Sequence, residues 1–207
     1  MSGTASVLVV DDDQDVRESF VAILEHHGYA VEAFASADAF LASPGAAAST
    51  GCLLLDIRMP GMDGMELLQY LHDCASRLKV VMVTGHGDQA LALRALRGGA
   101  CEFLEKPFLK EVLLAAVARA LSSDGIQEAA TTKEYEQRFS GLSDGQQSIV
   151  RAMLDGLDVR EIAERLNEKP RTIELERARI LSATQAQSIP HLLRMALSLE
   201  RVGTSPT

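Results

Sequence analysis

The first part of the chain alternates short apolar runs with segments of helical periodicity. Five runs suit strands: 7–10, 30–34, 52–55, 80–83 and 102–104. Three of them are almost wholly apolar, as expected for strands buried on both faces of a parallel sheet. A helical apolar stripe follows each run, and βα units repeated in this way predict a doubly wound α/β domain with a five-stranded parallel sheet over residues 1–121.

The second part of the chain carries helical patterns without strand patterns. Four short apolar stripes with helical spacing lie within residues 142–200, and a tight turn over 167–169 separates the second stripe from the third. Two short helices, a turn and a third helix are typical of the helix-turn-helix plan. We therefore expect residues 142–207 to form a small all-α helix-turn-helix domain.

A change in charge also separates the two parts. Residues 1–141 hold 11 of the 20 Lys and Arg and 20 of the 29 Asp and Glu, whereas residues 142–207 hold nine of each. Residues 122–141 are polar and charged with few apolar anchors, which favours a linker that can be partly helical. The overall charge of −9 does not by itself indicate a nucleic-acid binder.

Composition narrows the class of protein. The chain of 207 residues is 47% hydrophobic and 24% charged, which is ordinary for a globular protein and unlike a disordered one. No run approaches the roughly 18 apolar residues of a membrane helix, and the N-terminus lacks the pattern of a secretion signal. Three cysteines without metal-site spacing argue against disulfides and zinc. These features predict a cytoplasmic protein with no membrane partner.

Polar residues follow the predicted strands where the strands end. The first run leads into three aspartates, the third into one aspartate, the fourth into a threonine, and the fifth is followed by a lysine. These residues are Asp11, Asp12, Asp13, Asp56, Thr84 and Lys106. Because the carboxyl ends of parallel strands lie along one edge of the sheet, we expect these side chains to converge.

Converging carboxylates repel each other unless a cation lies among them. Mg²⁺ with a few carboxylates and several waters would relieve this repulsion and would neutralise an incoming phosphoryl group. Asp56 could then attack phosphorus and form an acyl phosphate, with Lys106 and Thr84 binding the phosphoryl oxygens. The alternative for the first aspartate run is a helix cap. A cap explains one aspartate alone, but not polar residues at four strand ends.

Four motifs in this part resemble the receiver domain of two-component response regulators. They are residues 9–13, 55–64, 84–87 and 105–108, and their wording is most similar to the FixJ group. The resemblance covers residues 5 to about 121. It implies that a sensor histidine kinase donates a phosphoryl group and that the domain accepts it without being an enzyme in the ordinary sense.

The resemblance also assigns the metal site. Asp56 corresponds to the phospho-accepting aspartate, and Asp11 and Asp12 correspond to the acidic pair, with Asp12 as the expected direct Mg²⁺ ligand. The backbone carbonyl of Arg58 corresponds to the neutral ligand. Asp13 has a weaker claim to this site, and its alternative role is that of a helix cap alone.

A switch is implied by three further matches. Thr84 corresponds to the switch hydroxyl, Phe103 to the switch aromatic and Lys106 to the family's lysine, whose bond to Pro107 resembles the family's cis peptide. Phosphorylation is expected to change the face formed by the fourth helix, fifth strand and fifth helix. Two receivers would then pair through this face as a homodimer and bring two C-terminal domains onto DNA.

The C-terminal part resembles the LuxR-type helix-turn-helix domain through residues 156–166, 170–174 and 188–197. In this frame Arg160 and Arg171 would contact phosphates, and Thr172, Leu175 and Arg179 would face the groove. The alternative is that all five lie on solvated helix faces.

Three departures from the LuxR-type pattern concern DNA binding. The domain opens with residues 143–146, Ser-Asp-Gly-Gln, where the family has Thr-x-Arg-Glu. Glu168 replaces an apolar turn residue, and Glu176 stands where His or Asn is common. A carboxylate near the DNA backbone would repel it. Two functions are thus compatible with the sequence: a DNA-binding transcription regulator switched by phosphorylation, or a regulator whose C-terminal domain binds another protein.

Overall fold

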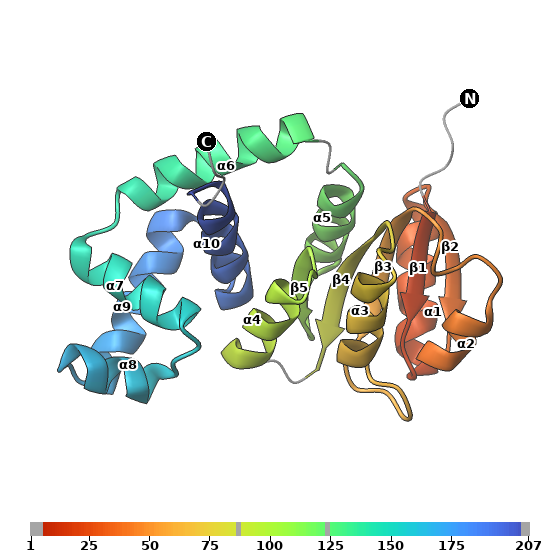
Figure 1. Cartoon of the computed structure of the whole chain (residues 1–207), viewed down its shortest axis with the longest axis horizontal. Helices are drawn as coiled ribbons and strands as arrows, with labels where there is room; N and C mark the ends of the chain where they lie inside the picture. Colours follow the sequence, from red (N-terminus) through yellow and green to blue (C-terminus); the bar gives the residue numbers. More distant parts are fainter. Residues whose placement is uncertain (1–5, 86–87, 123–124, 204–207) are drawn as a thin grey trace. The chain divides into compact units, whose positions relative to one another are not determined.

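The computed structural model describes residues 6–85, 88–122 and 125–203 (Figure 1). The chain divides into two compact units, one that contains the sheet and one made of helices, and residues 88–94 group with the helical unit. Within the described residues, no helix has the length and apolar character required to cross a membrane. His86 and Gly87 of the fourth receiver-like motif lie outside the described residues.

The first unit is built on one parallel sheet. Its strands occur in the order β2-β1-β3-β4-β5, and every neighbouring pair is parallel. The strand bounds are β1 Ser6–Val10, β2 Ala30–Phe34, β3 Gly51–Asp56, β4 Leu78–Thr84 and β5 Glu102–Glu105. From β1 the chain adds β2 on one side and β3, β4 and β5 on the other, so the order of strands switches between β1 and β3. In such sheets a crevice forms at the carboxyl ends of the two strands at the switch. The sheet and the helical second region confirm the predicted fold class.

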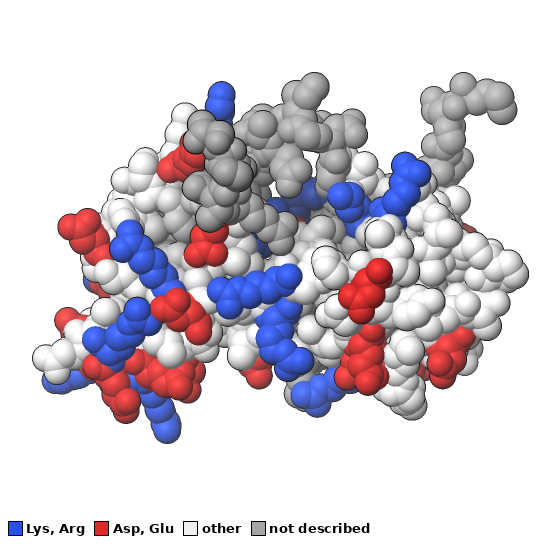
Figure 2. Space-filling view, in the orientation of Figure 1, with Lys and Arg blue, Asp and Glu red and all other residues white. Residues whose placement is uncertain are grey.

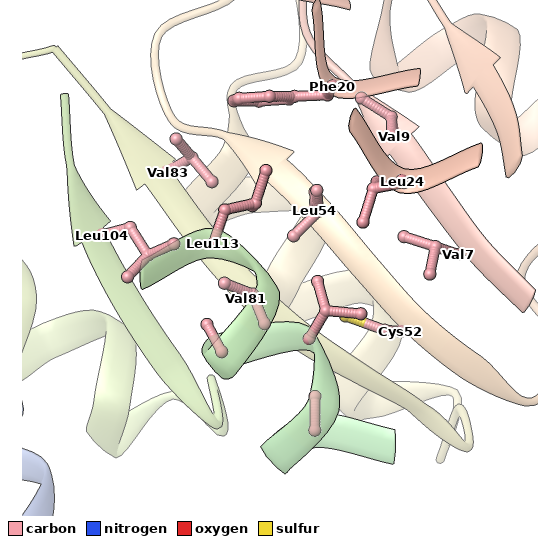
Figure 3. Close-up of a cluster of buried hydrophobic side chains, with 13 residues drawn as sticks. Val7, Val9, Phe20, Leu24, Cys52, Leu54, Val81, Val83, Leu104 and Leu113 are labelled. Atoms are coloured by element: carbon pink, nitrogen blue, oxygen red, sulfur yellow. The ribbon is translucent and has the colours of Figure 1, made fainter. Parts of the chain in front are cut away.

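Helices cover both faces of this sheet (Figure 1). They are α1 Gln14–His26, α2 Ala37–Ala42, α3 Gly64–Asp73 and α5 Lys110–Leu121, while α4 Gln89–Arg97 follows β4 along the chain and begins with residues that group with the helical unit. Side chains from one face of β1, β3, β4 and β5 pack against α1 and α5, as Figure 3 shows. This cluster includes Val9, Leu54 and Val83, so it lies directly beneath the strand ends that carry the polar residues.

Local signals explain where several of these helices begin and end. Asp13 is the N-cap of α1 and accepts from the backbone N–H groups of Asp15 and Val16. Asp63 and Glu66 form a capping box at the start of α3. The caps therefore fix the two helices that follow β1 and β3, and with them the loops that carry Asp11 and Asp56.

The second unit consists of α6 Gly125–Ser140, α7 Asp144–Leu154, α8 Val159–Leu166, α9 Pro170–Thr184 and α10 Ile189–Gly203. Capping boxes begin α7 and α8. Asn167 ends α8 in the left-handed conformation at φ 54°, and Pro170 opens α9 at its first turn. Within the described residues, α8, the turn and α9 form the expected helix-turn-helix, with Ile162, Ile173 and Ile180 buried between the helices.

The region expected to be a linker is occupied almost entirely by α6. Tyr135 of α6 is buried, and its hydroxyl accepts a hydrogen bond from the guanidinium of Arg194 in α10 at 2.8 Å. Arg138 donates to the carbonyl of Thr184 at the end of α9 at 3.3 Å. The C-terminal half of α6 thus packs within the helical unit, against α9 and α10.

Candidate functional site

One ammonium group connects two of the strand ends predicted to converge. The Nζ of Lys106 lies 2.8 Å from Asp11 Oδ2 and 2.9 Å from Asp56 Oδ1. Asp11 follows β1, Asp56 ends β3, and Lys106 follows β5, so residues far apart in sequence meet at one edge of the sheet. The hypothesis that carboxylates and an ammonium group gather there agrees with this geometry.

Asp56 is buried at this edge of the sheet, with only 7% of its surface exposed. Its second oxygen accepts from the backbone N–H of Arg58 at 2.6 Å. The loop beyond it folds tightly back, since Gly64 N–H donates to the carbonyl of Ile57 at 2.9 Å, and a Cβ on Gly64 would lie 2.1 Å from the Asp56 carbonyl oxygen. Glycine at position 64 is therefore required for α3 to start this close to Asp56.

Burial and neighbouring charges have opposite effects on the pKa of Asp56. Burial raises the pKa of the Asp56 carboxyl above its ordinary value, and the negative charge of Asp11 adds to this, while the hydrogen bonds from Lys106 and Arg58 oppose it. For Lys106, burial alone would lower the pKa, but its hydrogen bonds and ion pairs with Asp11 and Asp56 outweigh burial and raise it. Lys106 is therefore charged at neutral pH and compensates the two carboxylates.

Thr84 and Phe103 lie on the neighbouring strands β4 and β5. Thr84 is the last residue of β4 and is fully buried, and its carbonyl accepts from the Lys106 N–H at 2.7 Å. Phe103 lies on β5 opposite Met82 and is 2% exposed. The peptide bond between Lys106 and Pro107 is cis.

Asp12 and Asp13 differ from Asp11 in their surroundings. Asp11 is buried and accepts from the Asp13 N–H at 3.0 Å, and its carbonyl accepts from Arg17 at 2.7 Å. Asp12 is exposed next to it, whereas Asp13 caps α1. For Asp13 the structure thus shows the helix cap that the sequence offered as its alternative role.

The donor set suits a hard divalent cation. Among the described residues no group of three or more His, Cys, Asp or Glu side chains is placed to enclose a metal ion. Mg²⁺ does not need such a cage, because it is commonly held by one or two carboxylates, with water completing the shell. The site fits that requirement, because the carboxylate oxygens of Asp11 and Asp56 lie close together beside Lys106, and the exposed Asp12 follows Asp11.

The second candidate site is the exposed side of α9. Arg171, Leu175 and Arg179 are spaced four residues apart, and all three are exposed; Leu175 has 55% of its surface accessible. Thr172 is half-buried beside them, and Arg160 is exposed near the start of α8. The opposite side of α9 packs into the core of the unit, so the four α9 residues lie on its outward side or at the border of that side.

Glu176, which was expected to repel DNA, is held by neighbouring side chains. Its Oε2 accepts from Gln146 Nε2 at 3.0 Å, and its Oε1 forms an ion pair with Arg179. The hydrogen bonds from Gln146 and Arg179 lower the pKa of the Glu176 carboxyl below its ordinary value. The sequence singled out both Gln146 and Glu176 as departures from the LuxR-type pattern, but their contact was not foreseen.

Charges of both signs are mixed on the helical unit. In the face shown in Figure 2, acidic and basic side chains interleave over α7, α8 and α9. This agrees with the equal number of positive and negative residues in 142–207. Any DNA contact must therefore depend on individual placed side chains more than on a broad basic surface.

Two known families match the chain, one over most of the unit that contains the sheet and the other within the helical unit. Residues 7–118 match the response regulator receiver domain, and residues 140–196 match the LuxR family of bacterial regulatory proteins. The first match includes all five strands except Ser6 of β1, and the second covers α7, α8, α9 and part of α10.

Individual relatives align along nearly the whole chain. A transcriptional regulatory protein FixJ from Azorhizobium caulinodans is 41% identical over 200 residues, covering 95% of this chain and 94% of that protein. FixJ from Rhizobium meliloti is 38% identical, covering 93% of this chain and 95% of its own. Among solved structures, full-length FixJ from B. japonicum aligns with a TM-score of 0.52 and 36% identity over 95% of this chain and 98% of that one.

Proposed function

The chain belongs to the two-component response regulators that join a receiver domain to a LuxR-type DNA-binding domain, and from this we propose that Asp56 is its phosphorylation site and α9 its DNA-reading helix. It is a FixJ-like transcription regulator and not an enzyme. The family resemblance inferred from the sequence is thereby confirmed. The family implies a histidine kinase as phosphoryl donor and DNA as target.

The phosphoryl transfer uses the cluster at the sheet edge. A carboxylate oxygen of Asp56 attacks phosphorus of a phosphohistidine, the P–N bond breaks, and an acyl phosphate forms on Asp56. Lys106 is already 2.9 Å from Asp56 and carries the charge that a phosphoryl oxygen requires. The Thr84 hydroxyl provides a second contact to the phosphoryl group, from the end of the neighbouring strand.

Receiver domains generally use Mg²⁺ for phosphorylation, and the ion would neutralise the phosphoryl oxygens as charge moves between donor and acceptor. We assign Asp11, Asp12 and Asp56 as its carboxylate ligands and the carbonyl of Arg58 as its neutral ligand. The burial of Asp11 beside Asp56 and the exposure of Asp12 next to them support this assignment.

The switch follows from the packing of Thr84 and Phe103. Both are buried on neighbouring strands, and Phe103 lies opposite Met82, two residues before Thr84, so we infer that a movement of Thr84 toward the phosphoryl group is accompanied by a repacking of Phe103. This changes the face of α4, β5 and α5, through which two receivers pair as a homodimer. Pairing brings two copies of α9 to DNA, where Arg160 and Arg171 contact phosphates and Thr172, Leu175 and Arg179 face the groove.

The observation that carries this proposal is the bridge of Lys106 between Asp11 and Asp56. It is tested by incubating the full chain with acetyl phosphate and Mg²⁺ and measuring its intact mass. Wild type should gain one phosphoryl group and Asp56→Asn none, whereas Asp73→Asn, which alters an exposed aspartate on α3, should behave as wild type. Labelling of Asp56→Asn at the wild-type level would show that another residue is the acceptor.

A further inference from the structure

One arginine on the outward side of α9 is held in place by its own helix. Arg179 has 69% of its side-chain surface exposed, and its NH1 group pairs with Glu176 one turn earlier. Ile173 and Ile180 on the opposite side are buried in the core of the helical unit. Arg179 therefore extends into solvent while one edge of its guanidinium group is fixed.

The carboxylate that holds Arg179 is itself fixed from a second helix. Glu176 accepts a hydrogen bond from Gln146 Nε2 at 3.0 Å. Gln146 Oε1 in turn accepts a hydrogen bond from the backbone N–H of Ser143 at 3.2 Å, as part of the capping box of α7. A continuous chain of hydrogen bonds thus runs from the backbone at the start of α7 to the guanidinium of Arg179. With 22% of its side-chain surface exposed, Glu176 is more enclosed than the arginine it holds.

Among the residues that the structure describes, the pair with Glu176 leaves Arg179 with unused donors. A guanidinium carries five N–H groups in a rigid plane, and the pair with Glu176 uses the NH1 group. Two of the remaining groups can bind one acceptor pair side by side. In the major groove, guanine offers such a pair through O6 and N7, and this bidentate contact is the commonest specific one made by arginine.

We propose that Arg179 reads a guanine in the major groove and that Glu176, anchored by Gln146, is the positioning residue that orients it. This inference rests on the proposed function, since it requires α9 to be the DNA-reading helix. This role differs from the one expected from the sequence, in which Glu176 repels DNA. Both oxygens of the carboxylate already have partners, Gln146 and Arg179, and by orienting Arg179 the carboxylate increases the base specificity of α9.

A second glutamate on α9 separates this role from simple charge repulsion. Glu174 is exposed and belongs to the same helix, so Glu174→Ala removes the same charge as Glu176→Ala. If Glu176 only repelled DNA, both variants would strengthen binding to all sequences alike. If Glu176 orients Arg179, Glu176→Ala should weaken the preference for one base, whereas Glu174→Ala should not.

The test is selection from a randomised duplex pool by the phosphorylated full chain, followed by sequencing and by affinity measurement on the selected site and its single-base variants. Arg179→Ala should lose the preference for guanine at one position of each half-site by roughly 5- to 150-fold. Glu176→Ala should reduce the same preference, while Arg171→Ala and Glu174→Ala should keep it. Glu176→Gln, which retains an acceptor for Arg179, should restore part of it.

Two results would overturn the inference in different ways. If wild type binds DNA with a selected sequence but Arg179→Ala weakens all sequences equally, Arg179 contacts only phosphate, and the proposed DNA-binding function stands without this reading role. If phosphorylated wild type enriches no sequence while Asp56 is fully phosphorylated, DNA reading by α9 fails together with the inference.

Discussion

Gln146 and Glu176 are joined by a hydrogen bond of 3.0 Å between the amide Nε2 and the carboxylate Oε2. They lie on α7 and α9 and are 30 residues apart. Both occupy positions at which the sequence departs from the LuxR-type pattern. The contact makes the two departures one feature, because an amide donor at 146 suits a carboxylate at 176, whereas a carboxylate at both positions would bring like charges together.

The first prediction concerns this pair. Gln146→Glu should lower the melting temperature of the helical unit, because the new carboxylate would face that of Glu176. Adding Glu176→Gln to Gln146→Glu should recover most of the loss, since the swapped side chains can again pair and the capping box keeps an acceptor. Thermal unfolding followed by circular dichroism measures this. Gln137→Glu, at an exposed position of α6, is the charge control, and additive effects of the two substitutions at 146 and 176 would contradict the coupling.

The second prediction separates two neighbouring aspartates. Asp12→Ala should weaken Mg²⁺ binding, because we assign Asp12 as a ligand. Asp13→Ala should leave Mg²⁺ affinity nearly unchanged but lower stability by about 1 kcal/mol, because it removes the N-cap of α1. Calorimetric Mg²⁺ titration and urea unfolding of the two variants make the comparison. Equal loss of Mg²⁺ affinity in both would mean that the wrong aspartates have been assigned.

The third prediction concerns the pH dependence of stability. Because burial raises the pKa of Asp56, the native protein binds this proton more readily than the unfolded chain does. The stability of wild type should therefore fall as the pH rises from about 3.9, the ordinary value for aspartate, through the raised native pKa. Asp56→Asn does not titrate, so its advantage over wild type should grow through that window and then level off.

Urea unfolding of both proteins across this pH range provides the measurement. Asp73→Asn, in which the replaced aspartate is exposed, should show no such growing advantage. An advantage of Asp56→Asn that stays constant or shrinks with rising pH would mean that ionising Asp56 is not costly in the native state.

A fourth prediction concerns phosphate contacts. Arg171→Ala should weaken DNA binding to all sequences and reduce the slope of log affinity against log salt by about one contact. Arg151→Ala, which replaces an exposed arginine on α7 outside the proposed interface, should leave the slope unchanged. Anisotropy titrations at several salt concentrations decide the matter. An unchanged slope for Arg171→Ala would place that residue away from the DNA backbone.

The architecture of the first unit was predictable because its signals are local. Apolar runs such as 52–55 determine buried parallel strands, and the strand ends then bring Asp11, Asp56 and Lys106 together by topology alone. The ion pairs of Lys106 with Asp11 and Asp56 were not predicted themselves, because they depend on the order of the strands in the sheet. The assigned ligand roles of Asp12 and Arg58 are a different matter, because they depend on an ion and stay predictions.

Contacts between distant side chains of the helical unit were not predictable in the same way. The spacing of Ser143 and Gln146 is that of a capping box and could have indicated the start of α7. Nothing in the spacing indicates that Gln146 also reaches Glu176, because this depends on how α7 crosses α9. Likewise, Tyr135 lies in a polar stretch, and only its packing near α10 shows that α6 contributes to the core.

The proposed switch requires that phosphorylation of Asp56 increases DNA binding by α9. The affinity of the full chain for a labelled duplex carrying its selected site is measured by fluorescence anisotropy, with and without acetyl phosphate and Mg²⁺. Wild type should bind several-fold more tightly once phosphorylated, and Asp56→Asn should show no change. Equal affinity of the phosphorylated and unphosphorylated wild type, or the same gain in Asp56→Asn, would contradict the proposed switch.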